Sequence, residues 1–233
     1  QALADLENAT LALSRPLRSG RLTVSTFYSF ASLWLLPRLG QFRAAYPEID
    51  VRLKVTSALV DLVEGEADVA IRYGLGEYTG CRSTWLMGDS VFPVCSPTLI
   101  GADAAPRVVG DLLRYPLLVD DGLARSERRL FWEDWLEAGE PDSFIHLPDG
   151  FLTLQSALLG HGVALVRRST VIRYLKAGRL IRLLDEERPT LLSYYLVMPE
   201  NARNARSEAF ESWILEQVRD NTELPNLDEK DFA

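Results

Sequence analysis

Residues 22–55 read LTVSTFYSFASLWLLPRLGQFRAAYPEIDVRLKV, and residues 68–74 read DVAIRYG. Apolar and polar residues alternate at both ends of the first stretch, in residues 22–24 and 51–55, and each of these patterns predicts a β-strand. The second stretch is expected to return to the same sheet as a third strand. Together they predict three strands within about fifty residues.

The segment between the first two strands predicts a helix. Apolar residues recur there at every third position, which places them on one helical face. Pro47 ends this helix, and Gly65 ends a second, short amphipathic helix that is expected before the third strand. A strand–helix–strand series requires a mainly parallel sheet with helices on its faces. The residues of the first helical face are Leu33, Leu36, Leu39 and Phe42.

Ligands of such sheets bind beyond the carboxyl ends of the strands, which directs attention to the turn Ser25-Thr26-Phe27. The hydroxyls of Ser25 and Thr26, with the first helical amides, are candidates to hold a carboxylate or another anion. The alternative is that they only cap the helix. Arg72 and Tyr73 end the third strand at the same edge, where an arginine complements an anion. A surface ion pair is the alternative for Arg72.

Six further segments follow in a fixed order, so that the whole series from residue 22 covers about 170 residues. With the first two stretches, they resemble the regulatory half of a LysR-type transcriptional regulator. The resemblance is greatest to the subgroup of glycine-cleavage-operon activators and β-lactamase-gene activators. The six segments are residues 92–97 (FPVCSP), 111–113 (DLL), 115–118 (YPLL), 132–136 (WEDWL), 162–165 (GVAL) and 194–197 (YYLV).

The resemblance implies an α/β fold of two Rossmann-like lobes joined by two crossover strands, like a type 2 periplasmic binding protein. Lobe I is expected at residues 20–88 and 194–221, and lobe II at residues 89–193. Residues 1–19 are expected to be the C-terminal part of a linker helix, and residues 222–233 a flexible tail. A winged helix-turn-helix domain that precedes this region in the family is expected to be absent from this chain.

The apolar pattern of the second lobe predicts strands that alternate with helices, followed by a return to the first lobe. Strands are expected at residues 91–95, 117–119, 145–147 and 163–166, with helices at residues 126–138, 152–159 and 170–177. A returning strand is expected at residues 191–197 and a last helix at residues 205–219. That helix carries Phe210, Trp213, Ile214 and Val218 on one face.

The opening segment carries a possible dimerisation seam. Five mostly apolar positions are spaced three, four, three and four residues apart, which makes a two-heptad seam that Pro16 disrupts. One interpretation is an amphipathic helix that packs on its own domain. The resemblance favours the other, the end of the linker helix through which the full-length protein dimerises. The seam residues are Leu3, Leu6, Thr10, Leu13 and Leu17.

The second lobe offers a counterpart of the first helix start at Asp149-Gly150-Phe151. Relatives often place a small hydroxyl residue here to meet the ligand, whereas this chain has Gly150 and Phe151. Polar contact by these side chains is therefore in doubt, although backbone amides can still serve. Phe151 is expected to narrow the pocket or to prefer an apolar group.

Three further residues carry a binding hypothesis beside a plain structural one. Tyr194 matches a tyrosine that resembles a cleft residue in the β-lactamase-regulator branch, and burial in the core is the alternative. Asp120 and Asp121 follow a strand and could contact a ligand amine. A solvated loop is the commoner role of such a pair.

Composition limits the functions of the chain. Its 233 residues are 47% hydrophobic, which suffices for one large core or two smaller ones. A net charge of −8 repels a phosphate backbone, so contact with promoter DNA is expected only through the absent N-terminal domain. Cys81 and Cys95 are expected to be free thiols. No metal site, cofactor or membrane span is expected.

These observations predict a cytoplasmic sensor that is not an enzyme. A small effector, such as an amino acid, an aromatic acid or a cell-wall peptide, is expected to bind between the lobes and to alter DNA binding. Homodimers or tetramers are expected through the regulatory domains and the linker helix. A periplasmic solute-binding protein for transport is the alternative. An enzyme is less favoured because the sequence contains no G-x-S-x-G elbow and no H-E-x-x-H motif.

Overall fold

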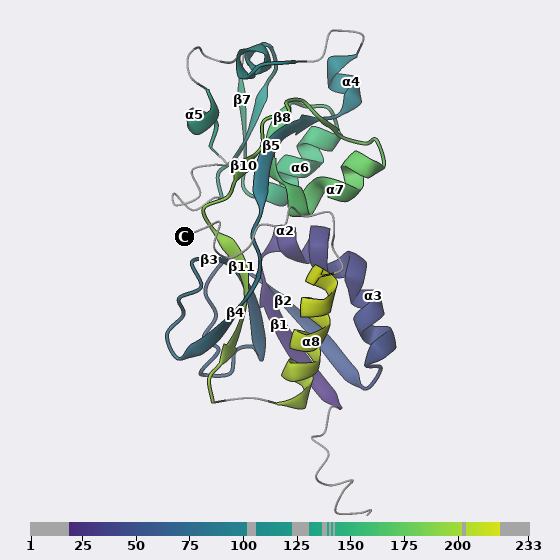
Figure 1. The fold of residues 1–233 in the computed structure, drawn as a ribbon, viewed down its shortest axis with the longest axis vertical. Coiled ribbons are helices and arrows are strands. Elements are labelled where there is room, and N and C mark those ends of the chain that lie inside the picture. Colours follow the sequence, from purple (N-terminus) through teal and green to yellow (C-terminus); the bar gives the residue numbers. More distant parts are fainter. Residues whose placement is uncertain are drawn as a thin grey trace, which may run out of the picture.

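The computed structural model places two β-sheets one above the other, each with helices packed against it (Figure 1). We refer to the lower sheet and its helices as lobe I and to the upper sheet and its helices as lobe II. The predicted linker helix before residue 19 and the predicted tail at residues 222–233 lie outside the described residues. The structure describes residues 19–101, 106–122, 131–136, 139, 141, 143–201 and 204–219.

The sheet of lobe I has the strand order β2-β1-β3-β11-β4. The central strand β1 (Gly20–Thr26) pairs in parallel with β2 (Ile49–Val55) and β3 (Val69–Gly74). The returning strand β11 (Ser193–Pro199) pairs antiparallel with β3 and with β4 (Cys81–Met87). The predicted parallel core of the sheet is therefore confirmed.

One long helical segment joins β1 to β2, and its middle turn is widened. The segment runs through α2 (Tyr28–Phe30), a π-helical turn η1 (Ala31–Leu35) and α3 (Leu36–Ala45). After the widened turn, a backbone N–H donates to the carbonyl five residues earlier. Pro37 accounts for the distortion, because it has no N–H and its ring crowds the carbonyl four residues before it.

The widened turn changes the direction of the predicted apolar face, and the prediction of a single face is wrong. Leu33 is buried in the core of lobe II rather than of lobe I, and Leu36 is 51% exposed. Phe42 alone is fully buried in the core of lobe I, with Leu39 packed against that core. A π-helical turn rotates the residues after it, so a regular three-residue spacing does not describe one surface here.

The second predicted helix, before Gly65, is also wrong. Residues 56–67 contain bends and turns, and the Asp61 carboxylate accepts the N–H of Glu64 at 2.9 Å. The N–H of Glu66 donates to the Asp61 carbonyl, which closes the turn around Gly65. Gly65 has φ of +79°, a left-handed conformation that favours glycine. The sequence signal marked a turn rather than the end of a helix.

The last helix, α8 (Ala205–Arg219), covers one face of the lobe I sheet (Figure 1). Phe210, Trp213 and Ile214 are buried, and Val218 is partly buried against the same core. The predicted bounds and apolar face of this helix are confirmed. Burial of a large apolar side chain contributes about 1.5–3 kcal/mol, so this face is a main source of stability for lobe I.

Lobe II combines parallel and antiparallel strands in the order β10-β5-β8-β6-β7, and β9 also pairs with β5. The predicted strands and the helices α6 and α7 are confirmed to within a few residues. Of the helix predicted at residues 126–138, the described part contains a single turn, α5. The strands are β5 (Ser90–Cys95), β6 (Leu117–Asp120), β7 (Phe144–Leu147), β8 (Val163–Arg167), β9 (Ile181–Arg182) and β10 (Arg188–Pro189). The helices are α4 (Pro97–Ile100), the 3-10 turn η2 (Val109–Arg114), α5 (Trp132–Trp135), α6 (Gly150–Leu158) and α7 (Arg168–Lys176).

The chain crosses between the lobes twice, from β4 to β5 and from β10 to β11, and the two crossings are bonded to each other. The carbonyl of Asp89 accepts the N–H of Thr190 at 2.9 Å and its hydroxyl at 3.0 Å. The carboxylate of Asp89 accepts the N–H of Ser90 at 2.8 Å and both the N–H and the hydroxyl of Ser169. Burial raises the pKa of Asp89 against the effect of these hydrogen bonds.

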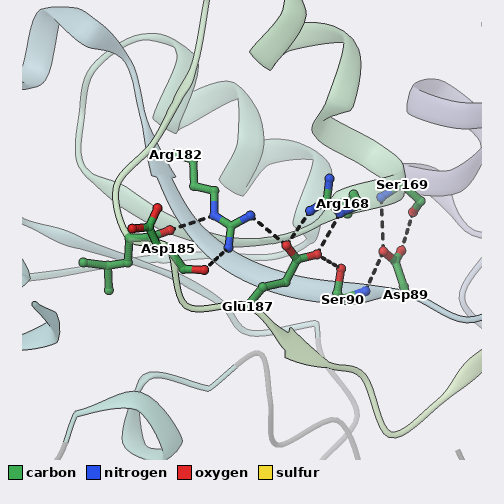
Figure 2. Close-up of polar contacts among 8 residues, drawn as sticks. Asp89, Ser90, Arg168, Ser169, Arg182, Asp185 and Glu187 are labelled. Atoms are coloured by element: carbon green, nitrogen blue, oxygen red, sulfur yellow. Dashed lines mark hydrogen bonds and ion pairs between the residues drawn. The ribbon is translucent and has the colours of Figure 1, made fainter. Parts of the chain in front are cut away.

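A second carboxylate lies beside the crossing. Glu187 accepts hydrogen bonds from the guanidinium groups of Arg168 and Arg182 and from the hydroxyl of Ser90 (Figure 2). Burial opposes ionisation, but the hydrogen bonds from Arg168 and Ser90 still hold the pKa of Glu187 below its ordinary value. The crossing is therefore a connected set of charged and polar groups.

The first helical segment of lobe I also contacts lobe II. α2 lies against α6, and the π-helical turn lies against α7 (Figure 1). Through this contact Leu33 enters the apolar cluster that contains Phe92 and Leu154 of lobe II. The fold class predicted from the sequence, two α/β lobes with two crossovers, is confirmed.

Two smaller predictions concern the thiols and the membrane. Cys81 and Cys95 are both free, as expected. Among the described helices, none has the length and apolar character needed to cross a membrane.

Candidate functional site

A cavity of about 480 Å³ lies between the lobes. The parallel strands β1, β2 and β3 end on its lobe I side, and the parallel strands β6, β7 and β8 end on its lobe II side. Ligands of α/β sheets bind beyond the carboxyl ends of the strands, and here two such edges face one space. Lobe I contributes Phe27, Tyr28, Ser29, Val55, Thr56, Ser57, Leu59, Arg72, Tyr73 and Tyr78. Lobe II and the second crossing contribute Asp120, Gly122, Pro148, Asp149, Gly150, Arg167 and Leu192.

A slightly larger hollow of about 540 Å³ lies on lobe II, beside Arg107, Leu136 and Leu184. Every residue that lines it belongs to lobe II, so a ligand there would contact one lobe. The cavity between the lobes is the stronger candidate because both lobes supply its walls and the crossings lie next to it.

Arg72 is the charged group of the lobe I wall. It is only 6% exposed, and its guanidinium donates to the Ser25 hydroxyl at 3.0 Å. The ion pairs among the described residues do not include Arg72, so a hydroxyl rather than a carboxylate faces its charge. Burial lowers the pKa of Arg72, against a smaller effect of Tyr78. A buried guanidinium with donors to spare is suited to a carboxylate.

Two predicted site residues lie behind the wall. Ser25 and Thr26 are fully buried and do not line the cavity. Ser25 supports Arg72, and the Thr26 hydroxyl has no hydrogen-bond partner within the described part of the chain. Phe27, also predicted, does line the cavity, and Ser29 supplies a hydroxyl there. The residues that line the cavity therefore lie slightly later in the chain than predicted, at the start of the helix rather than at the end of β1.

An aromatic cluster supports the same wall. Tyr73 lines the cavity, and its ring centroid lies 4.7 Å from that of Tyr194. The Tyr194 ring also lies 6.2 Å from Phe27 and 5.1 Å from Phe30. Tyr194 is fully buried and is not part of the cavity lining, so it packs behind Tyr73. Its hydroxyl lies 3.3 Å from the hydroxyl of Ser169, which binds Asp89 at the crossing.

The lobe II wall is formed around the start of α6. The Asp149 carboxylate accepts the N–H groups of Phe151 and Leu152, each at 2.9 Å, and so caps the helix. Asp149 and Gly150 line the cavity, whereas Phe151 does not. Two of the amides that could hold an anion are already occupied by a carboxylate.

Gly150 lies against the side chain of Asp120. A Cβ on residue 150 would lie 2.9 Å from Oδ2 of Asp120, so the end of that side chain would have to shift to admit it. Gly122 is similarly constrained, because a Cβ there would lie 2.5 Å from the Pro148 carbonyl oxygen. The carboxylate of Asp120 therefore occupies the space that a side chain at position 150 would need.

Asp120 is the main titratable group of this wall. Burial raises the pKa of Asp120 to about 6, against opposing effects of the Arg167 charge and the Gly122 N–H. The Gly122 N–H donates to it at 2.9 Å, and the ion pairs of the described residues do not include it. At neutral pH it is a desolvated carboxylate facing the cavity.

Two side-chain contacts join the lobes at or beside the cavity. The guanidinium of Arg167, at the end of β8, lies 4.2 Å from the centre of the Tyr73 ring of lobe I. The ring of Phe151 meets that of Tyr28 edge-on, with centroids 5.1 Å apart. Cation–π and aromatic contacts contribute about 0.5–1.5 kcal/mol each, so both help to hold the present arrangement of the lobes.

The structure thus brings Phe27, Arg72, Tyr73, Asp149 and Gly150 together on the cavity. It leaves Ser25, Thr26, Phe151 and Tyr194 outside its lining. Arg167 and Tyr78 were not foreseen from the sequence. Arg167 ends a parallel strand of lobe II, so the carboxyl-edge rule could have found it. Tyr78 lies in the turn after β3 and carries no comparable signal.

The chain matches the family described as "LysR substrate binding domain" over residues 15–219. It is 33% identical over 218 residues to the glycine cleavage system transcriptional activator of Escherichia coli K12, which covers 92% of this chain and 70% of the activator. It is also 33% identical to the transcriptional activator AmpR of Rhodobacter capsulatus, over 84% of this chain and 66% of that protein.

Solved structures agree with these matches. The effector domain of the regulator AmpR of Pseudomonas aeruginosa superimposes with a TM-score of 0.68 at 30% identity, covering 86% of this chain and 96% of that one. These relatives are regulators of transcription rather than enzymes. The family match, the identities and the two-lobe fold agree, and the chain belongs to the LysR-type transcriptional regulators, as their effector-binding domain.

Proposed function

We propose that the cavity between the lobes binds a small effector, and that the bound effector alters how the full-length regulator holds promoter DNA. The observation that carries this proposal is a cavity with walls from both lobes and a buried arginine, Arg72, with no carboxylate partner among the described residues. Phe27, Arg72, Tyr73, Asp149 and Gly150 are proposed as contacts. Ser25, Thr26, Phe151 and Tyr194 are proposed as support behind them.

The proposed mechanism is a shift between arrangements of the lobes. A ligand changes such an equilibrium only if it binds one arrangement more tightly than the other. A ligand that touches Arg72 of lobe I and Asp120 of lobe II makes both contacts in only some arrangements. A coupling of about 1–3 kcal/mol, typical of allosteric proteins, corresponds to a 5- to 150-fold change in affinity.

The rest of the regulator is proposed by analogy with the family. The net charge of −8 makes this domain a poor partner for DNA, so we assign promoter binding to a winged helix-turn-helix domain. We assign assembly to homodimers or tetramers through the effector domains and a linker helix, and the location to the cytoplasm. Transport by a solute-binding protein is not favoured, because the relatives reported above regulate transcription.

A thermal-shift screen with a cavity-blocking variant tests the effector site. Amino acids, aromatic acids and cell-wall peptides are added to the wild type and to Ser57→Trp, which places an indole at the cavity from an exposed residue. One class is expected to stabilise the wild type saturably, and Ser57→Trp is expected to lose that response. Ser212→Trp, on the exposed side of α8, is the matched control. A response that survives in Ser57→Trp would place the effector elsewhere.

A further inference from the structure

The two walls of the cavity carry opposite charges. On the lobe I side, the guanidinium of Arg72 is 6% exposed and is opposed by the Ser25 hydroxyl. On the lobe II side, the carboxylate of Asp120 lies against Gly150, and Asp149 lies next to it on the same wall. A desolvated charge that forms no ion pair is costly, so each wall favours a ligand group of the opposite charge.

The lobe II wall is unsuited to an anion, although a helix begins there. Helix N-termini commonly hold anions through their free N–H groups. In α6 the Asp149 carboxylate already accepts the N–H groups of Phe151 and Leu152. The space beside Gly150 is taken by the second carboxylate, that of Asp120. A ligand carboxylate placed here would meet two negative charges, whereas an ammonium group would meet two acceptors.

Arg167 is the cation of the lobe II wall, and its position limits its effect. Its guanidinium lies over the Tyr73 ring at 4.2 Å, and no ion pair between described residues joins it to Asp120. Its charge partly offsets the cost of ionising Asp120. The Arg167 charge therefore helps to keep Asp120 ionised. The hydrogen bonds to its carboxylate are left for a ligand ammonium group to donate.

The remaining lining predicts the body of the ligand. Tyr28, Val55 and Leu59 line the cavity and are 51%, 41% and 74% exposed. Single exposed apolar residues are common on protein surfaces, but these three share one cavity. A ligand that covered them would remove apolar surface from water.

We propose that the cavity recognises a small zwitterion with an apolar body, whose carboxylate pairs with Arg72 and whose ammonium group pairs with Asp120. This inference rests on the proposed function, since it names the class of effector for the same site. An anion with no ammonium group would give Asp120 no donor from the ligand and would place a second negative charge near it. A simple amine would leave the guanidinium of Arg72 without a carboxylate.

A matched set of compounds tests the requirement for both charges. The zwitterions are L-phenylalanine and the longer L-alanyl-L-phenylalanine, which differ in the distance between ammonium and carboxylate groups. The single-charge controls are 3-phenylpropanoate and 2-phenylethylamine. Calorimetric titration of the wild type is expected to give at least tenfold tighter binding for one zwitterion than for either control. That factor corresponds to one charge-assisted hydrogen bond.

Variants then assign each charge to its wall. Asp120→Asn is expected to weaken the binding of the zwitterion by about 10- to 100-fold. The affinity for 3-phenylpropanoate is expected to stay the same or to rise. Arg72→Gln is expected to weaken the binding of the zwitterion and of 3-phenylpropanoate alike. The affinity for 2-phenylethylamine is expected to stay unchanged. Asp121→Asn is the control for charge alone, because Asp121 is exposed, pairs with His146 and does not line the cavity.

The outcomes separate the ligand class from the site. Binding of 3-phenylpropanoate as tight as that of both zwitterions, or equal loss in Asp120→Asn and Asp121→Asn, would overturn the zwitterion proposal. So would the absence of binding by every compound in the set. If Ser57→Trp still abolished the response to another compound class, the effector site would stand without the zwitterion. Binding that is insensitive to Ser57→Trp would reject the site itself.

Discussion

Asp120 and Gly150 meet at the start of α6, where the Asp120 carboxylate lies beside the glycine. Neither residue reveals this alone. The sequence offered Asp120 only as a loop residue able to contact an amine, and Gly150 only as a missing hydroxyl. Their contact depends on the pairing of β6 with β7, which a single sequence does not give.

The raised pKa of Asp120 predicts a cost to stability. The pKa is about 6 in the folded chain against an ordinary value of 3.8, so the folded state binds the proton more tightly than the unfolded state. Stability therefore falls as pH rises from about 3.8 to 6, and the full cost is present above pH 6. Asp120→Asn removes the charge and is expected to raise the free energy of unfolding by about 1–2 kcal/mol at pH 7.5, and by little near pH 4.

Urea unfolding at the two pH values measures this effect. The exposed Asp121→Asn should change stability by less than about 0.5 kcal/mol at either pH. An equal gain in both variants, or a destabilised Asp120→Asn, would contradict the assignment. A gain in stability together with a loss of ligand affinity would identify Asp120 as a residue that serves binding at the expense of the fold.

At the scale of elements, the sequence predicted the strands and the bounds of α6, α7 and α8 to within a few residues, and it failed where the backbone departs from regular periods. The period of three in Leu33, Leu36, Leu39 and Phe42 indicated a single face, but Pro37 imposes a widened turn and the faces diverge. The helix start near Ser25 was located correctly, yet neither Ser25 nor Thr26 lines the cavity. The rotation of the chain at the end of β1 decides which side chains face the ligand, and residue patterns do not encode it.

The polar network beside the crossings yields a second prediction. Glu187→Gln leaves Arg168 and Arg182 without their carboxylate partner, since both pair with Glu187. The variant is expected to lose about 1–3 kcal/mol of unfolding free energy, less than a fully buried pair would. Because the pKa of Glu187 is lowered, its contribution should be present above about pH 4.5 and should fade at lower pH.

Glu186→Gln is the matched control, because Glu186 is more exposed and pairs with Arg188 alone among the described residues. Chemical unfolding of both variants at pH 7.5 and pH 4 gives the comparison. Equal losses in the two variants would show that the network contributes no more than a surface ion pair.

For the whole molecule, Leu33 provides an apolar contact that joins the lobes away from the crossings. It belongs to the helical segment of lobe I and is buried among Phe92, Leu154 and other residues of lobe II. Leu33→Ala is expected to cost about 2–4 kcal/mol and to loosen the lobes. Hydrogen exchange should then accelerate in α6 and α7, although the substitution lies in lobe I.

Leu36→Ala provides the comparison, because Leu36 lies one turn away and is 51% exposed. It should change neither stability nor exchange appreciably. If Leu33→Ala accelerated exchange in lobe I alone, the contact would not join the lobes in solution.

The bonds between the two crossings limit how the lobes can move. The Asp89 carbonyl holds Thr190 of the other crossing, and the Asp89 carboxylate holds the start of α7. The two connections are thereby held together as one unit, and Leu33 provides a second contact between the lobes. We expect this arrangement to permit rotation of one lobe relative to the other and to resist sliding of one lobe past the other. We therefore expect effectors of different shapes to be reported through one coordinate, the angle between the lobes.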